Sequence, residues 1–373
     1  MPTSRSPRSD DSGRPSRRPR LPQHRAGRLW LAGLLAVGTA FAGASLATAG
    51  EDGAAPAEAA PADAAPEAVT PLAEHGALEV CGTTLCGENG EPVQLRGMST
   101  HGTQWFEHCV TEESLDVLAD DWGADVIRVS TYVQEDGYET DPAYFTDVAS
   151  RIIDQATERG MYVVVDWHML TPGDPNANTE LAKQFFTEIT ARHGDQDNLI
   201  YEIANEPNGV SWSAIRGYAE EVIPVVRAGD PDSVVIVGTR GWSSLGVSDG
   251  SDESEIVADP VNAENVMYTF HFYAASHQEG YIDTLERAAD QLPIFVTEFG
   301  AEEYTGDGAH DFEFADRYLD LLAEKNISWT NWNYSDDFRS GAVFEPGTCD
   351  AGSWGDPGSL KESGVWISER IRG

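Results

Sequence analysis

Apolar and polar positions follow one another in a regular pattern from about residue 75 to the end of the chain. Short apolar runs rich in Val, Ile, Tyr and Phe are typical of buried strands. Eight such runs occur, at residues 93–99, 124–130, 162–168, 199–205, 233–239, 266–272, 293–299 and 328–333. Stretches typical of amphipathic helices accompany them, at residues 111–123, 141–160, 177–193, 211–229, 279–292, 308–326 and 359–371.

This alternation of strands and helices predicts an α/β fold with a parallel sheet. Eight strands in about 300 residues favour closure into a (β/α)8 barrel, or TIM barrel, that forms one domain over residues 75–373. An open, doubly wound sheet is the alternative. It is disfavoured because no glycine-rich phosphate loop follows the first strand.

The first 74 residues differ in composition from the rest. An Arg-rich start leads into an apolar stretch at 29–46 and then Ala47-Thr48-Ala49, a pattern typical of a signal peptide over residues 1–49. A membrane anchor is the alternative, but small residues interrupt the stretch and acidic residues follow it. Residues 50–74 consist mainly of Ala, Pro and acidic residues, which predicts a disordered linker.

Charge narrows the possible partners. The net charge is −39, and it falls to about −45 without residues 1–49, which carry eight Arg and two Asp. We therefore do not expect nucleic acid as a partner, because phosphate binding needs clustered cations. We expect a secreted, extracellular monomer that has no membrane contact once the signal peptide is removed.

Four cysteines follow the predicted signal peptide, and none has zinc-ligand spacing to a histidine. In an exported protein they should form disulfides. Cys81 and Cys86 flank a short turn, so we expect them to pair. Cys109 would then pair with Cys349 and join the loops after the first and last strands, which is one of three possible pairings.

Polar side chains gather at the carboxyl ends of the predicted strands, where barrel enzymes keep their chemistry. They are His101, Arg128, Asp166, His168, Asn205, Glu206, His271, Tyr273, Glu298 and Trp332. Their convergence from seven of the eight strands indicates an active site rather than scattered surface groups.

Glu206 and Glu298 are the two acids that glycosidic bond cleavage requires, one protonated and one ionised. They lie at the ends of the fourth and seventh predicted strands and should face each other across the barrel. We expect Arg128 and Tyr273 to hold Glu298 in its ionised form. Burial and the charge of Glu298 should keep Glu206 protonated.

His101, His168 and His271 offer an alternative, a metal site at the barrel mouth. The three histidines follow well separated strands and no His-x-His pair occurs, so we expect neither a metal nor another cofactor. His168 and His271 are better explained as hydrogen-bond donors to a sugar or to the acids.

Three tryptophans, Trp105, Trp242 and Trp332, lie in or beside loops at the same end of the barrel. Aromatic rings stack on the apolar faces of sugars, while His, Asn and Glu bind the hydroxyl groups. A cleft with this lining is suited to a polysaccharide.

Six segments of the sequence resemble the bacterial endoglucanases of glycoside hydrolase family 5. They are LRGMSTHGTQW (95–105), VVVDWH (163–168), IYEIANEPNG (200–209), MYTFHFY (267–273), IFVTEFG (294–300) and SWTNWN (328–333). The resemblance implies a secreted, retaining β-1,4-glucanase that cleaves cellulose and related glucans. A mannanase or xyloglucanase on the same scaffold, or an inactive polysaccharide-binding barrel, is the alternative.

The resemblance also implies residue roles. Glu206 would be the general acid/base and Glu298 the nucleophile. Supporting positions would be Arg128, His168, Asn205, His271 and Tyr273, and substrate-binding positions would be His101, Trp105, Tyr132, Trp242, Trp332 and Asp337. One departure concerns the loop after Trp332, where related enzymes often place a lysine and then a glutamate, whereas this chain has Asp337 and then Arg339.

Overall fold

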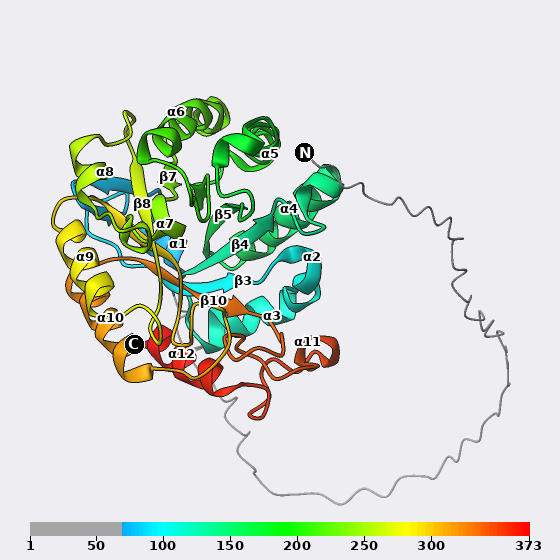
Figure 1. The fold of residues 1–373 in the computed structure, drawn as a ribbon. Helices are drawn as coiled ribbons and strands as arrows, with labels where there is room; N and C mark the ends of the chain where they lie inside the picture. Colours follow the sequence, from blue (N-terminus) through cyan, green and yellow to red (C-terminus); the bar gives the residue numbers. More distant parts are fainter. Residues whose placement is uncertain (1–68) are drawn as a thin grey trace, which may run out of the picture. The chain divides into compact units, whose positions relative to one another are not determined.

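The computed structural model describes residues 69–373, in which eight parallel strands close into a barrel (Figure 1). The barrel strands are β3 (Arg96–Thr100), β4 (Val126–Tyr132), β5 (Tyr162–His168), β6 (Leu199–Glu202), β7 (Val234–Val237), β8 (Val266–Tyr273), β9 (Ile294–Gly300) and β10 (Trp329–Tyr334). Strand β10 pairs in parallel with both β9 and β3. The predicted barrel is therefore confirmed, and the open sheet is excluded.

Helices surround the barrel in Figure 1. The longer ones are α4 (Pro142–Glu158), α5 (Thr179–His193), α6 (Trp212–Gly229), α9 (Glu279–Ala289), α10 (Phe312–Glu324) and α12 (Glu362–Arg372). Short helices are α2 (Thr103–Phe106), α3 (Glu112–Asp116), α7 (Arg240–Ser243), α8 (Ser254–Ala258) and α11 (Thr348–Ala351). Within residues 69–373, no helix has the length and apolar character needed to cross a membrane.

Local sequence signals explain where helix α4 begins. Asp141 accepts a hydrogen bond from the Tyr144 N–H, and Pro142 occupies the first turn of α4. The predicted helix at 111–123 is present over residues 112–121, but it changes from an α-helix (α3, Glu112–Asp116) to a π-helix (Val117–Asp121).

The core has two layers because the strands are buried on both faces. Between strands and helices lies the larger apolar cluster, which includes Ile152, Phe186 and Val222. Inside the amino-terminal end of the barrel lies a second cluster, formed by Val126, Tyr162, Val164, Ile200, Val234, Ile236, Met267 and Phe295 together with flanking residues. The carboxyl end of the barrel interior is left for polar side chains.

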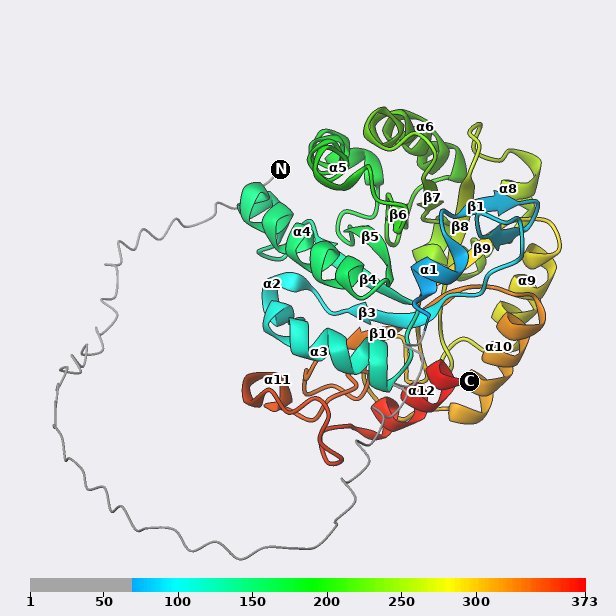
Figure 2. The ribbon, with the colours of Figure 1, turned by 180° about the vertical axis from the view of Figure 1, so that it is seen from behind.

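The amino-terminal end of the barrel is covered by helix α1 (Pro71–His75) and a hairpin of β1 (Glu79–Cys81) and β2 (Thr84–Cys86), as Figure 2 shows from behind. The Leu72 N–H donates to the Gly160 carbonyl, and Leu72 packs on the barrel interior. The folded part thus begins a few residues before the expected boundary at 75. The predicted signal peptide (1–49) and residues 50–68 of the predicted linker lie outside the described residues.

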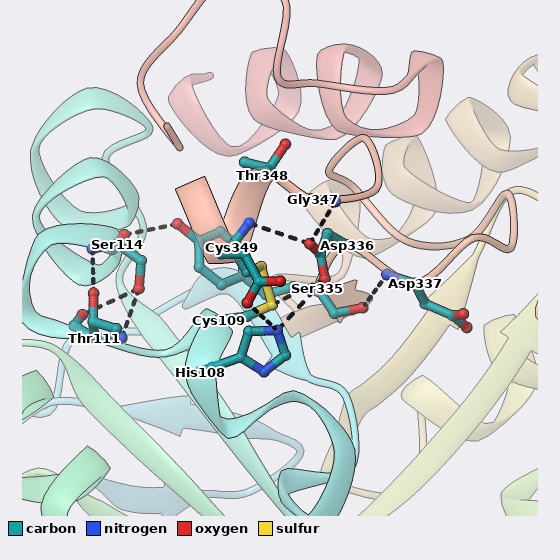
Figure 3. Close-up of a disulfide and its surroundings, with 12 residues drawn as sticks. His108, Cys109, Thr111, Ser114, Ser335, Asp336, Asp337, Gly347, Thr348 and Cys349 are labelled. Atoms are coloured by element: carbon teal, nitrogen blue, oxygen red, sulfur yellow. Dashed lines mark hydrogen bonds and ion pairs between the residues drawn. A yellow bond between two sulfur atoms is a disulfide. The ribbon is translucent and has the colours of Figure 1, made fainter. Parts of the chain in front are cut away.

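Both expected disulfides are present. Cys81 and Cys86 join the ends of the β1–β2 hairpin, and Cys109 pairs with Cys349 across 240 residues. Figure 3 shows this second disulfide beside Asp336, whose carboxylate accepts hydrogen bonds from the N–H groups of Gly347 and Cys349. The bond therefore ties the loop after the first barrel strand to the loop after the last.

We predict that the two disulfides differ in their contribution to stability. Loop-closure entropy gives about 5 kcal/mol for a 240-residue loop and about 2 kcal/mol for the small hairpin loop. The pair Cys109→Ser/Cys349→Ser should therefore lower the free energy of unfolding in urea by more than Cys81→Ser/Cys86→Ser, both measured without reductant. Equal losses for the two double variants would contradict this expectation.

Candidate active site

The two predicted acids meet at the carboxyl end of the barrel. Glu298 lies in β9, and Glu206 lies in the loop after β6. One carboxyl oxygen of Glu206, one carboxyl oxygen of Glu298 and one ring nitrogen of His271 lie within 4.8 Å of one another. The barrel thus brings together two carboxyl groups that are 92 residues apart in the sequence.

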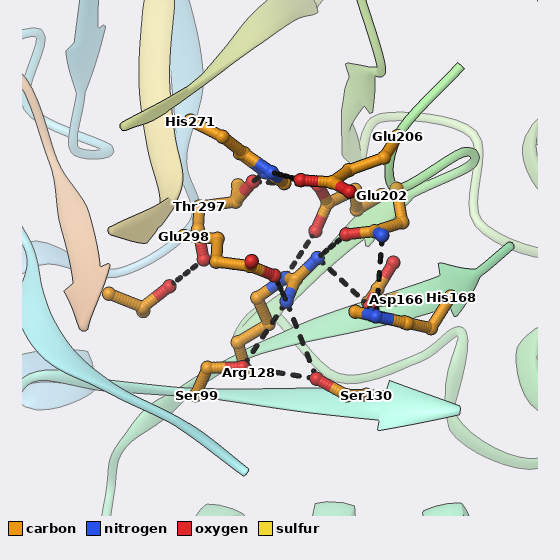
Figure 4. A network of polar contacts seen from close by, with 12 residues as sticks. Ser99, Arg128, Ser130, Asp166, His168, Glu202, Glu206, His271, Thr297 and Glu298 are labelled. Atoms are coloured by element: carbon orange, nitrogen blue, oxygen red, sulfur yellow. Dashed lines mark hydrogen bonds and ion pairs between the residues drawn. The ribbon is translucent and has the colours of Figure 1, made fainter. Parts of the chain in front are cut away.

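Arg128 on β4 is the centre of the polar network below this pair (Figure 4). Its guanidinium is fully buried and donates to Glu202 at 2.6 Å, to Asn205 at 2.6 Å and to Glu298 at 3.2 Å. Asp166 lies 2.9 Å from Nη2, the same nitrogen that donates to Asn205. Because a buried cation is costly unless it is paired, these partners are needed to hold Arg128 in place.

Glu298 is surrounded by groups that favour its ionised form. The Tyr273 hydroxyl donates to one carboxylate oxygen at 2.6 Å, and Arg128 donates to the other. Burial raises the pKa of Glu298, but the charges of His271 and Arg128 outweigh it and hold the pKa below its usual range. The expected contacts of Arg128 and Tyr273 with Glu298 are present.

Glu206 has a different environment. Its side chain is 14% exposed, and its Oε1 lies 3.0 Å from Nδ1 of His271. Burial raises the pKa of Glu206, and the negative charge of Glu298 adds to the increase, although His271 opposes it. The pKa values of the two acids therefore move in opposite directions, which is the condition for one acid and one base.

His168 supports the network from β5. Burial lowers the pKa of His168 to about 3, so the ring is neutral near pH 7. Its Nδ1 lies 2.6 Å from Asp166 and its Nε2 lies 3.3 Å from the Asn205 amide nitrogen. The neutral ring can therefore donate to Asp166 and accept from Asn205, whose amide oxygen faces Arg128.

Two cavities meet over the acids, because Glu206, Tyr273 and Tyr304 line both of them. The first has a volume of about 280 Å³ and is lined by Glu298 and, among the predicted sugar contacts, by His101, Trp105, Tyr132, Trp332 and Asp337. The second has a volume of about 630 Å³ and is lined by His271, His277, Tyr281 and the predicted contact Trp242. Every residue predicted to bind substrate thus faces one of the two cavities.

Aromatic rings form one wall of the first cavity. His168 stacks between Tyr132, at 4.0 Å between ring centroids, and Trp332, at 5.4 Å. The loop after Trp332, which departs from the family pattern, also lines this cavity with Asp337 and Arg339. Arg339 donates to Asp337 at 2.9 Å, and His101 lies 3.7 Å from the same carboxylate. The acid and base of this loop therefore pair with each other at the edge of the cavity.

Sequence reasoning missed several residues that the structure places at this site. Glu202 and Thr297 lie in strands β6 and β9 and are fully buried beside Arg128 and His271. A charged residue inside the apolar run 199–205 was a signal for Glu202. Tyr304, which is 68% exposed at the junction of the cavities, lies in a loop with no comparable signal.

A metal site on the three histidines is not formed within residues 69–373, where His101, His168 and His271 do not make one group of ligand atoms. Glu206, His271 and Glu298 do lie close enough to share a cation. The buried charge of Arg128 already occupies one side of Glu298, so this trio is better explained by proton chemistry.

The structure can be compared with known proteins. The family model described as Cellulase (glycosyl hydrolase family 5) matches residues 86–338. Over 298 residues the chain is 64% identical to Endoglucanase E-5 of Thermobifida fusca, covering 80% of this chain and 64% of that protein. It is 60% identical over 304 residues to Endoglucanase MaCel5A of Microbulbifer sp., covering 81% and 59%. The chain spans about three fifths of the length of these two relatives.

Solved structures agree with this match. The crystal structure of the catalytic domain of Thermobifida fusca endoglucanase Cel5A has a TM-score of 0.81 at 64% identity and covers 82% of this chain and 100% of that chain. A variant of the same domain in complex with cellotetraose also has a TM-score of 0.81, at 63% identity, with the same coverage.

Glu302 is a further buried carboxyl group near the pair. It is 1% exposed, and its Oε1 has no hydrogen-bond partner among the described residues. Gly300 and Gly341 approach it so closely that a Cβ at either position would overlap the carboxyl group. Burial raises the pKa of Glu302 from 4.5 to about 8, despite backbone hydrogen bonds that lower it, and the charge of Glu298 adds to the increase.

We predict that Glu302→Gln stabilises the protein at neutral and alkaline pH. Because the folded-state pKa is raised, wild-type stability falls as the pH rises from 4.5 towards 8. The glutamine keeps the shape of the neutral acid, so the variant should be more stable by about 3 kcal/mol at pH 7 and equally stable at pH 4. Urea unfolding across this pH range measures the difference, and a gap that does not change with pH would contradict the prediction.

Proposed function

The chain belongs to glycosyl hydrolase family 5, and from this premise we propose that it is a retaining endo-β-1,4-glucanase that cleaves internal bonds of cellulose and related glucans. The observation that carries the proposal is the pair Glu206 and Glu298: the two carboxyl groups lie close together, and their pKa values are shifted in opposite directions. The names of the two relatives described above, both endoglucanases, at 64% and 60% identity, support the substrate class.

The separation of the acids supports retention of configuration. Retaining enzymes hold their two carboxyl groups about 5 Å apart, whereas inverting enzymes need roughly 6.5–9.5 Å to admit a water. One oxygen of Glu206 and one oxygen of Glu298 lie within 4.8 Å of each other, which is nearer to the separation in retaining enzymes than to that in inverting ones. The short separation therefore favours direct attack by one carboxylate on the sugar.

In the first step, the ionised Glu298 attacks the anomeric carbon while Glu206 gives its proton to the leaving oxygen. The bond to the leaving sugar breaks, and an ester forms between Glu298 and the remaining chain. In the second step, Glu206 takes a proton from water, whose oxygen attacks the same carbon and releases Glu298. Arg128 and Tyr273 stabilise the Glu298 carboxylate before and after the ester exists.

The two cavities then take opposite sides of the cleaved bond. The sugar that becomes attached to Glu298 lies in the first cavity, over Trp332 and Tyr132. The leaving chain lies in the second cavity, which contains His271 and the half-exposed Trp242. Because both cavities open onto one another at Glu206, a chain can pass across the site and be cut internally.

We also propose that the protein is exported. The apolar stretch at 29–46 with small residues at 47–49 supports this, and so do two disulfides in a chain with four cysteines.

We predict that Glu298→Gln and Glu206→Gln lower kcat/KM on carboxymethylcellulose by at least about a thousandfold, because each removes one half of the acid–base pair. With an aryl β-cellobioside, whose leaving group needs no proton, only Glu206→Gln should keep rapid formation of the glycosyl enzyme. Azide should then rescue Glu206→Gln as a β-azide. A wild type that releases no more reducing sugar than Glu298→Gln on any polysaccharide would falsify the enzyme proposal.

We predict that Trp242 acts on the leaving side only. Trp242→Ala should raise KM for cellopentaose about fivefold, since one aromatic stacking contact is worth about 1 kcal/mol. It should leave kcat/KM for an aryl β-cellobioside within about twofold. Trp105→Ala, in the other cavity, is the matched control and should weaken the binding of both substrates.

The substrate assignment is tested separately. Higher activity on mannan or xyloglucan than on β-1,4-glucan would replace it.

A further inference from the structure

A chain of hydrogen bonds runs beneath the acid/base from β6 through β9 to β8 (Figure 4). The Thr297 hydroxyl lies 2.7 Å from Oε1 of Glu202 and 2.9 Å from Nε2 of His271. Nδ1 of His271 in turn lies 3.0 Å from Oε1 of Glu206. Glu202, Thr297 and His271 are all buried, so no water competes for these contacts.

The charge of Glu202 fixes the first donor of the chain. Burial raises the pKa of Glu202, but Arg128 and His271 outweigh it and lower the pKa to about 2. Arg128 donates to its Oε2 at 2.6 Å. An ionised carboxylate only accepts hydrogen bonds, so the single hydrogen of the Thr297 hydroxyl must point to Glu202.

This assignment fixes the proton on His271. Since its one hydrogen is used, Thr297 Oγ1 can only accept from His271, and Nε2 must therefore carry a hydrogen. The Thr269 hydroxyl also contacts Thr297 Oγ1 and must donate to it for the same reason. Nδ1 is then the ring atom that faces Glu206.

The titratable groups around His271 come from strands β4, β5, β6 and β9 and from the loops after β6 and β8. Glu202, Glu206 and Glu298 favour its protonated form and raise the pKa to about 9, although burial opposes them. His168 and His277 also interact with His271 and are neutral near pH 7, because burial lowers their pKa values to about 3 and about 4. Arg128, which pairs with Glu202 and Glu298, is charged. His271 can therefore hold a second proton on Nδ1, which donates to Glu206 after that acid has lost its own proton.

We propose that Glu202 and Thr297 are positioning residues for the acid/base: they keep a proton on Nε2 of His271, so that Nδ1 is always directed at Glu206. This inference rests on the proposed function of Glu206. When Glu206 gives its proton to the leaving oxygen, the Nδ1–H of His271 stabilises the new carboxylate until water supplies a proton in the second step. Thr297 and Glu202 touch no substrate: Thr297 acts through His271, and Glu202 acts through Thr297 while it also pairs with Arg128.

Two matched variants test the chain. Thr297→Val keeps the shape of the side chain and removes the hydroxyl, whereas Thr297→Ser keeps the hydroxyl. The ¹⁵N signals of His271, identified by their loss in His271→Asn, report which ring nitrogens carry hydrogen as the pH is changed. We expect Nε2 to stay protonated in the wild type and in Thr297→Ser. In Thr297→Val the midpoint of His271 should fall by about one pH unit or more.

Kinetics provide the second readout. Thr297→Val should lower kcat on cello-oligosaccharides at least about tenfold while KM changes by less than about twofold, because the loss affects proton transfer and not binding. Thr297→Ser should restore kcat to within about twofold of wild type. A loss of packing alone would instead lower stability in both variants without moving the His271 midpoint.

The proposal is overturned if Nε2 of His271 lacks a hydrogen in the wild type, or if Thr297→Val matches Thr297→Ser in His271 midpoint or in kcat. These outcomes differ from failure of the proposed function, which appears as a wild type without hydrolysis. In that case the NMR titration still decides whether Glu202 and Thr297 hold the proton.

Discussion

The buried positive charge of Arg128 is the constraint on which the rest of the site depends. A guanidinium without water must be paired on every edge, because an unpaired buried charge costs several kcal/mol. Glu202, Asp166 and Glu298 supply carboxylates from three different strands, and Asn205 supplies an amide oxygen. The positions of these three carboxylates are therefore set by the same cation, which links the geometry of the site to the stability of the barrel.

The two ends of the barrel differ in composition and in what they contribute. Its amino-terminal end is filled with Val, Ile, Phe and Tyr side chains and covered by α1 and the β1–β2 hairpin, so it contributes burial and rigidity. Its carboxyl end holds the polar network, whose members are fixed by hydrogen bonds between neighbouring strands. Because the polar groups stand on packed strands, they can hold opposite protonation states at Glu206 and Glu298 without rearranging.

The sequence predicted only some of the residues in this network. Arg128, Tyr273 and the two acids follow apolar strands directly, and side chains at the ends of parallel strands must converge when the sheet closes. Glu202 and Thr297 were not recognised, because a threonine in a strand is ordinary and the partner of a buried glutamate depends on the register of another strand. Glu302 was missed for the same reason, since its carboxyl group is packed by Gly300 at the end of β9 and by Gly341 in the loop after β10.

The sequence alone predicted the barrel, the order of its strands and the two candidate acids, because periodicity, residue type and strand order are local or topological properties. It left three disulfide pairings possible, of which the structure forms the expected one. Only the tertiary structure decided the distance between Glu206 and Glu298, the directions of their pKa shifts and the hydrogen-bond chain through His271. These depend on burial and on contacts between atoms of residues far apart in the chain. Electrostatic interactions between buried groups change steeply with such distances, and no pattern along the sequence specifies them.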